Sequence, residues 1–207
     1  MKRILCFGDS NTWGYIPGTG SLQRFSESER WTSLLQQRLG SEYKVIEFGL
    51  CGCESSGKHT NMYFNTDAQS IYSSVLVASS PLDVVIIMLG TNDLKNINEW
   101  KKGDTASGIK KLIDTTRLLA PQTKIILAAP ILLDERIVSD PEFVISSVAD
   151  SEACASEVAQ LAQAENLAFF DTNNFVHERG SDGCHFTAES HAAFAEGIFE
   201  LLKEKGV

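Results

Sequence analysis

A serine, a histidine and an aspartate in this sequence stand where they could together carry out acyl transfer. That chemistry needs a nucleophile, a base that takes its proton and a group that orients the base. Ser10 follows a short apolar run, at a point where a strand could turn into a helix. His185 could accept the serine proton, and Asp182, three residues earlier, could bind the other ring nitrogen. The pattern predicts Ser10 as nucleophile, His185 as general base and Asp182 as the residue that orients the base.

The oxyanion formed during acyl transfer also needs hydrogen-bond donors, and two further turns could provide them. Gly52 lies in a turn after the second apolar run, and Asn92 follows the third run. The N–H groups of Ser10 and Gly52 and the side-chain amide of Asn92 could converge on one oxygen. Loss of one such donor typically lowers turnover by ~10²–10³. This set of residues needs no metal and no organic cofactor, and we expect neither.

These side chains need a scaffold that brings distant turns together, and the apolar pattern predicts one. Apolar runs predict strands at residues 4–7, 43–48, 83–89, 124–129 and 167–170. Helical spacing of apolar residues predicts helices at 30–39, 66–79, 109–119 and 154–161, and after Thr187. Near-continuous apolar strands crossed by helices indicate a three-layer α/β/α fold with a parallel sheet. Sites in such sheets lie beyond the carboxyl ends of the strands, where these turns fall.

The composition fits one globular domain over residues 1–207. The chain is 43% apolar and 22% charged, which argues against disorder. A net charge of -9 argues against a nucleic-acid partner, because phosphate binding needs a basic patch. No apolar stretch approaches the ~18 residues of a membrane span, so we expect no membrane partner.

The first residues of the sequence and its cysteines predict the cellular compartment of the protein. Its basic and then apolar start ends at Gly8-Asp9, which is too short for a secretory signal. Five cysteines without such a signal indicate thiols in a reducing compartment. We therefore expect a cytoplasmic protein.

Four blocks of the sequence, taken together, resemble the SGNH (GDSL-type) hydrolases. The blocks are Gly8-Asp9-Ser10-Asn11, Gly52, Gly90-Thr91-Asn92-Asp93 and Asp182-x-x-His185. The segments 3–10, 24–32 and 86–93 look closest to the arylesterase/acyltransferase branch of that family. The resemblance implies a flavodoxin-like five-stranded fold, esterase activity and a small-molecule ester as the partner. It is also consistent with self-association into a homo-oligomer.

The sequence departs from the family pattern at two places. Asn11 stands where a leucine often follows the serine, and Glu47 or Phe48 replaces an asparagine near the end of the second strand. The second departure leaves a choice between Gly52 and Gly49 as the oxyanion donor. The lipase-type G-x-S-x-G motif is absent, so the α/β-hydrolase fold is not implied.

Several reactions share this machinery, and we expect hydrolysis of esters with short acyl groups. Acyl transfer to an alcohol, thioester cleavage and carbohydrate deacetylation are the alternatives. Short groups are favoured because the scaffold uses most of the chain and the candidate cover, residues 130–150, carries several carboxylates. Trp13 could bind substrate in the acyl pocket, whereas Trp31 fits core packing at least as well.

A nucleotide-binding module is the alternative from a different class. Residues 52–59 nearly match the phosphate-binding G-x-x-x-x-G-K-[ST] loop, with Lys58 as its lysine. However, His59 stands where a hydroxyl should hold Mg²⁺, and Glu54 would place negative charge in the phosphate cradle.

The remaining cysteines and histidines are expected to have structural or solvent-exposed positions. Cys51 and Cys53 are spaced too closely for a zinc site. Cys184 could be a nucleophile beside His185, but neighbouring side chains in extended backbone point apart. His191 falls in the final helix and is expected to be solvated.

Overall fold

The computed structural model describes residues 1–19, 22–57 and 67–207, and within them five parallel strands form one sheet. In chain order the strands are β1 (Lys2–Gly8), β2 (Tyr43–Gly49), β3 (Val84–Met88), β4 (Lys124–Ala128) and β5 (Ala168–Phe170). Their spatial order is β2-β1-β3-β4-β5, which confirms the predicted flavodoxin-like sheet. The direction of winding reverses between β1 and β3. Ligands of such folds bind at the carboxyl ends of the strands beside this point.

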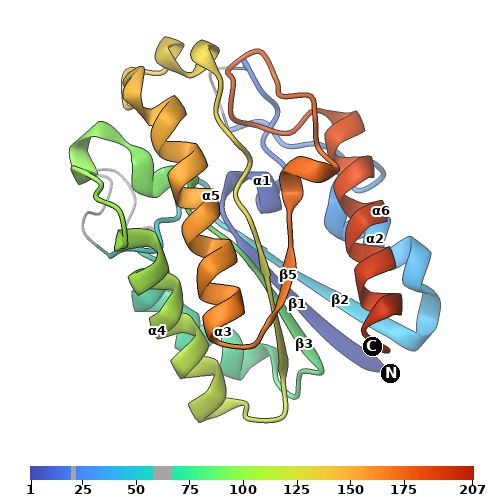
Figure 1. The fold of residues 1–207 in the computed structure, drawn as a ribbon. Coiled ribbons are helices and arrows are strands. Elements are labelled where there is room, and N and C mark those ends of the chain that lie inside the picture. The colour runs from blue at the N-terminus through green and yellow to red at the C-terminus, as the bar shows by residue number, and fades with distance from the viewer. Residues whose placement is uncertain (20–21, 58–66) are drawn as a thin grey trace.

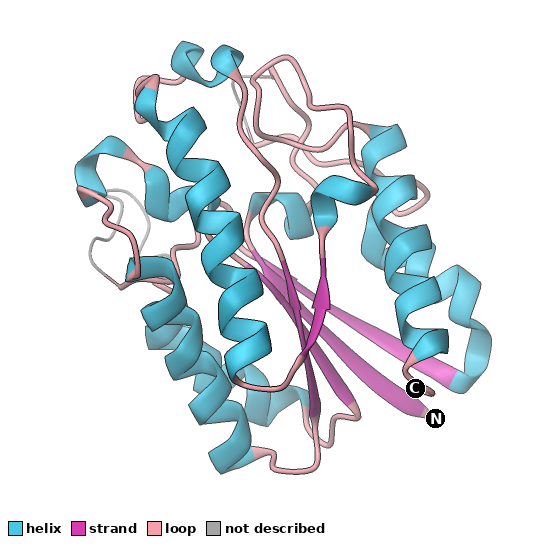
Figure 2. Ribbon diagram, in the orientation of Figure 1, coloured by secondary structure: helices cyan, strands magenta, loops and turns pink. Residues whose placement is uncertain are grey.

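Helices cover both faces of the sheet, which gives the three layers predicted (Figure 1). One face carries α2 (Trp31–Leu39) and α6 (Ala188–Glu204), which pack against each other. The other face carries α3 (Ala68–Ser79), α4 (Asp104–Leu119) and α5 (Ser146–Ala164) (Figure 2). A short helix, α1 (Ser10–Trp13), follows β1 directly. Among the described helices, none is long and apolar enough to cross a membrane.

The central strands are apolar throughout because both of their faces are buried. In β1, Ile4 and Cys6 face the layer of α2 and α6, whereas Leu5 and Phe7 face the opposite layer. All four are at most 1% exposed. Burying one large apolar side chain contributes about 1.5–3 kcal/mol. The two cores therefore fix the strand register, since a slip of one residue would exchange the faces.

The predicted strands lie within about two residues of the observed ones, and the helices differ mainly at their N-termini. Helix α5 starts at Ser146, well before the apolar pattern at 154, because its first turns are polar. The segment 130–150 contains a short 3₁₀ helix, η4 (Glu135–Ser139), before α5 begins. Of the segment 54–66, whose structure the sequence did not predict, residues 58–66 lie outside the described residues.

Thr187 caps α6, as predicted, but the expectation that His191 is solvated was wrong. The Thr187 side chain accepts a hydrogen bond from the Ser190 N–H (3.2 Å), and His191 is 1% exposed. Its Nδ1 accepts from the N–H of Trp31 at 3.3 Å. Burial lowers the pKa of His191 to about 3, and the charge of Arg30 acts in the same direction.

This buried histidine predicts a loss of stability in acid. The pKa of His191 is lowered from 6.5 to about 3, so the unfolded chain binds a proton at a higher pH than the folded chain does. The free energy of unfolding is therefore unaffected by this group above pH 6.5 and decreases as the pH falls below that value. The slope can reach about 1.4 kcal/mol per pH unit. His191→Asn keeps an acceptor for Trp31 but cannot titrate, so its unfolding free energy should depend less on pH. Denaturant unfolding at a series of pH values measures this.

The exposed His177, changed to Asn in the same way, is the matched control and should keep the wild-type pH dependence. Equal acid sensitivity in wild type and His191→Asn would contradict the prediction.

Candidate active site

Ser10 is positioned by a tight turn between β1 and α1. The Asp9 side chain caps α1 by accepting a hydrogen bond from the Asn11 N–H at 2.9 Å. A Cβ on Gly8 would lie 2.2 Å from Thr12 Oγ1 and 2.8 Å from the Met88 carbonyl oxygen. Only glycine therefore lets α1 turn back over the ends of the strands. Burial raises the pKa of Asp9 to about 6.

Ser10, His185 and Asp182 form one chain of hydrogen bonds. Ser10 Oγ lies 2.9 Å from His185 Nε2, and His185 Nδ1 lies 2.9 Å from Asp182 Oδ2. The other Asp182 oxygen, Oδ1, accepts the backbone N–H of His185 at 3.1 Å. Burial alone would raise the pKa of Asp182, but the hydrogen bonds and charge of His185 hold it well below its usual range.

This arrangement suits proton transfer from the serine to the imidazole. An ionised Asp182 can only accept, so Nδ1 of a neutral His185 carries the proton and donates it to Asp182. Nε2 is then left to accept from Ser10. The structure thus brings together the nucleophile, base and orienting group that the sequence predicts, in the order that acyl transfer requires.

The loops after β2 and β3 complete a pocket around Ser10. Its volume is about 210 Å³, and Ser10, Gly52, Asn92 and His185 are among the residues that line it. Asn92 is 6% exposed, and its side-chain amide donates to the carbonyl oxygen of Cys53 at 3.2 Å. The structure therefore places all the predicted oxyanion donors at one cavity.

The structure favours Gly52 over Gly49 as the glycine of this site. Gly52 lines the pocket and has a φ of 78°, a backbone angle that residues with a side chain rarely adopt. Gly49 has a different task, because a Cβ there would lie 2.1 Å from the backbone nitrogen of Trp13. It allows α1 to pack against the end of β2.

The loop that follows Gly52 is tied to the loop after β3 by a buried carboxylate. Asp93 accepts the N–H groups of Ser55 (2.7 Å) and Ser56 (3.1 Å), and the Thr105 hydroxyl (2.8 Å). These N–H groups lie where a nucleotide-binding loop would face a phosphate, and here they face a negative charge. The carboxylate thus argues against the nucleotide alternative; Lys58 and His59 lie outside the described residues.

Several residues at the site were not found from the sequence. The Tyr15 ring lies 4.4 Å from the His185 ring, centre to centre, and lines the pocket. Lys95 is 6% exposed, and its Nζ lies 2.8 Å from Glu142 Oε2. Lys95 stands three residues after Asn92, and this spacing could have predicted that Lys95 lies at the site.

Trp13, which was expected to bind substrate, is not among the residues that line the pocket, and its ring lies 5.1 Å from the Arg24 guanidinium.

Cys184 lies beside His185, which corrects the expectation that the two side chains point apart. The backbone there is a tight turn, and Cys184 Sγ lies 3.2 Å from His185 Nδ1. Burial and the charge of Asp182 raise the pKa of this thiol well above its usual value. A protonated thiol is a poor nucleophile, so the structure still favours Ser10 over Cys184.

Asn11, the first departure from the family pattern, holds the turn that carries His185. Its amide nitrogen donates to the carbonyl oxygen of Cys184 (3.1 Å), and its amide oxygen accepts the Phe186 N–H (2.8 Å). Both bonds are buried, one on each side of His185. Asn11 thus joins α1 directly to the turn that presents the base.

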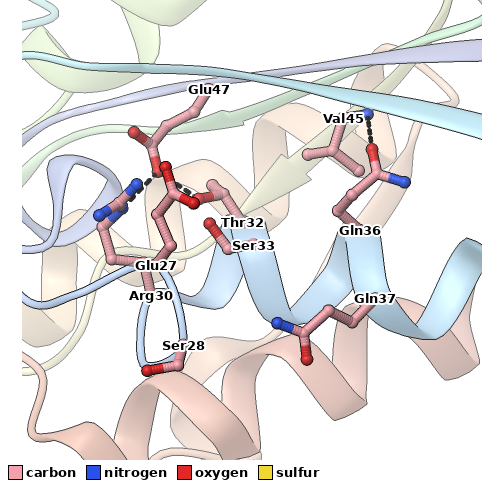
Figure 3. Close-up of a pocket in the computed structure, with 9 residues that line it drawn as sticks. All are labelled: Glu27, Ser28, Arg30, Thr32, Ser33, Gln36, Gln37, Val45 and Glu47. Carbon is pink, nitrogen blue, oxygen red and sulfur yellow. Dashed lines mark hydrogen bonds and ion pairs between the residues drawn. The ribbon is translucent and has the colours of Figure 1, made fainter.

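Glu47, the second departure, lies at a larger hollow of about 500 Å³ away from Ser10 (Figure 3). It accepts hydrogen bonds from Arg24, Arg30 and Thr32. The residues that line this hollow include no histidine and no cysteine. The cluster fixes the segment between α1 and α2, because Arg30 also donates to the Phe25 carbonyl oxygen at 2.9 Å.

Comparisons with known proteins show to which family the chain belongs. The model of the GDSL-like lipase/acylhydrolase family matches residues 6–193. The inhibitor-bound aryl esterase of M. smegmatis is 30% identical, with a TM-score of 0.91 over 99% of each chain. Est24, a carbohydrate acetylesterase from Sinorhizobium meliloti, is 28% identical, with a TM-score of 0.89 over 99% of this chain and 100% of that one.

A third solved structure, a putative arylesterase from Agrobacterium tumefaciens, is 29% identical, with a TM-score of 0.83 over 99% of each chain. A search of curated proteins found no match. The family model covers most of the chain and includes Ser10, Gly52, Asn92, Asp182 and His185. The resemblance predicted from the four blocks is confirmed, and the chain, a carboxylic ester hydrolase, belongs to the GDSL-like lipase/acylhydrolase family.

Proposed function

We propose that this protein is a serine esterase that cleaves carboxylic esters with short acyl groups through an acyl-enzyme on Ser10. The observation that carries the proposal is the unbroken hydrogen-bond chain from Ser10 through His185 to Asp182. A serine is a weak nucleophile unless a neighbouring base takes its proton, and in this row of hydrogen bonds His185 is the base.

In the first half of the proposed reaction, Ser10 Oγ attacks the ester carbonyl and His185 Nε2 takes the serine proton. The ionised Asp182 stabilises the imidazolium that forms. The N–H groups of Ser10 and Gly52 and the Asn92 amide bind the oxyanion. His185 then returns the proton to the leaving alcohol, which departs and leaves the acyl group on Ser10.

In the second half, His185 takes a proton from water, and the hydroxide attacks the acyl-enzyme. The acid leaves as Ser10 regains its proton from His185. If an alcohol replaces water, the same steps give acyl transfer. Removal of an acetyl group from a carbohydrate would use the same site, and the S. meliloti acetylesterase supports it as the second candidate.

The short acyl group is inferred from the walls of the pocket. Its volume of about 210 Å³ is below the ~300–1,000 Å³ of typical ligand pockets. Lys95, Asp140 and Glu142 line it, so it offers charged groups where a long chain would need an apolar groove. Phe143 belongs to a small apolar cluster with Leu94, Leu133 and Ile137, and so holds this wall in place.

Replacement of the nucleophile tests the proposal directly. Ser10→Ala should fold normally and lower kcat on a small ester by several orders of magnitude, on the order of 10⁶ as in another serine triad. A fluorophosphonate probe should label wild type at Ser10, as mass spectrometry of peptides can show. Ser28→Ala, at an exposed position, is the control. Near-normal turnover by a folded Ser10→Ala protein would refute the mechanism.

The acyl pocket is tested with a series of p-nitrophenyl esters that differ only in acyl length. We expect kcat/KM to be highest for acetyl to butyryl groups and to fall for longer chains. In an open apolar groove each added CH₂ would instead contribute about 0.8 kcal/mol of binding. Values that rise steadily towards long chains would show that the pocket accepts lipids.

Asn11 is expected to act as a positioning residue for the base. Asn11→Ala leaves the Phe186 N–H and the Cys184 carbonyl without their partner, which should cost about 1–3 kcal/mol of stability. It should also lower kcat by up to about 10²-fold with little change in KM, because His185 is less well placed. Asn11→Asp should not restore activity, because a buried carboxylate oxygen would then face the Cys184 carbonyl oxygen. Wild-type kcat in both variants would show that Asn11 only stabilises the fold.

A further inference from the structure

We propose that Asp182, Cys184 and His185 form a binding site for a thiophilic divalent cation such as Zn²⁺, and that occupation of this site blocks the base. Each residue offers a different ligand atom: a carboxylate oxygen, a thiol sulfur and a ring nitrogen. These atoms all lie within 4.8 Å of one another, and among the described residues this is the group of three that could hold a metal ion.

The ligand atoms of the three residues lie close enough for one ion to bridge them. Ideal bond lengths place two tetrahedral ligands of zinc about 3.4–3.6 Å apart. Here His185 Nδ1 lies 3.2 Å from Cys184 Sγ and 2.9 Å from Asp182 Oδ2, and the sulfur lies 3.8 Å from the other carboxylate oxygen, Oδ1. Because Nδ1 and Sγ approach different oxygens, the Asp182 carboxylate has to turn as the ion takes the place of the Nδ1 proton.

The backbone that carries these ligands is already held in the required turn. The N–H groups of Cys184 and His185 both donate to Asp182 Oδ1, at 3.2 and 3.1 Å. The His185 carbonyl oxygen accepts the Gly180 N–H at 2.8 Å, and Asn11 binds the backbone on both sides of His185. Little conformational entropy remains to be lost when a metal binds, which favours affinity.

The pocket gives the metal a route to the site. Cys184 and His185 both line the cavity that contains Ser10, whereas Asp182 is not among its lining residues, so an ion would enter past Cys184 and His185. The cavity also has room for water, which can serve as the fourth ligand of a site with three protein ligands. Metal and ester would therefore compete for the same entrance.

The proton balance explains why binding would inhibit. Cys184 binds as a thiolate, and its proton goes to the solvent. His185 stays neutral: Nδ1 takes the metal, and the proton that it donated to Asp182 ends on Nε2. An Nε2 that carries a proton cannot accept one from Ser10. The site itself is independent of the proposed function, and only the inhibition depends on it.

Metal binding is measured first, without reference to activity. Ser10→Ala protein titrated with Co²⁺ should develop thiolate-to-cobalt absorption that saturates at one ion per chain. The same titration of Ser10→Ala/Cys184→Ala should lack this absorption, whereas Ser10→Ala/Cys51→Ala, which loses another thiol of the same pocket, should keep it. Absence of the thiolate band in Ser10→Ala, or its persistence without Cys184, would overturn the site.

Inhibition is measured next, with each protein compared with its own metal-free activity. Zn²⁺ should inhibit wild type and EDTA should restore activity, whereas Mg²⁺, which prefers oxygen ligands, should have no effect. Cys184→Ala should need more than about 10²-fold more Zn²⁺ for the same inhibition, and Cys51→Ala should not. Equal sensitivity of wild type and Cys184→Ala would overturn the proposed inhibition.

Discussion

The hydrogen bond between Ser10 and His185 joins parts of the chain that are 175 residues apart, and much of the structure holds its two ends in place. Ser10 is fixed by the cap of α1 and by the close packing of Gly8 against the end of β3. His185 is fixed by its own turn and by Asn11. Because Asn11 directly follows Ser10, the proposed nucleophile and the residue that holds the proposed base in place lie in the same short helix. A shift of α1 would therefore move both together.

A second constraint orders the loops that line the pocket. Asp93 is fully buried and accepts hydrogen bonds from the Ser55 backbone N–H, earlier in the chain, and from the Thr105 hydroxyl, later in the chain. Burial raises its pKa, so an ionised Asp93 depends on these hydrogen bonds. Gly108 allows this arrangement, because a Cβ there would lie 2.1 Å from the Ser55 carbonyl oxygen. Helix α4 thus supports the loop that carries Gly52, although it contributes no residue to the pocket.

The fold and the grouping of the candidate site residues could be predicted because their signals are local. Buried parallel strands are continuous apolar runs, and the first three runs end at the turns that carry Ser10, Gly52 and Asn92. What the sequence did not predict depends on tertiary contacts. Helical spacing assigned His191 to α6 but not to its buried face beside Trp31. Glu142 reaches Lys95 only because the segment before α5 folds back over the pocket. Cys184 was misplaced because the turn around Gly183 was treated as extended.

The carboxylate of Asp182 has two effects at neighbouring residues. It accepts a hydrogen bond from His185 Nδ1 and so orients the base of the proposed mechanism. It also disfavours a thiolate at Cys184, which lies 3.8 Å from Oδ1. One carboxylate therefore both supports the base and keeps a nearby thiol unreactive. A cation that binds all three side chains would stabilise the Cys184 thiolate. It would then occupy His185 Nδ1, the nitrogen that is hydrogen-bonded to Asp182. Catalysis and metal binding at this turn thus exclude each other.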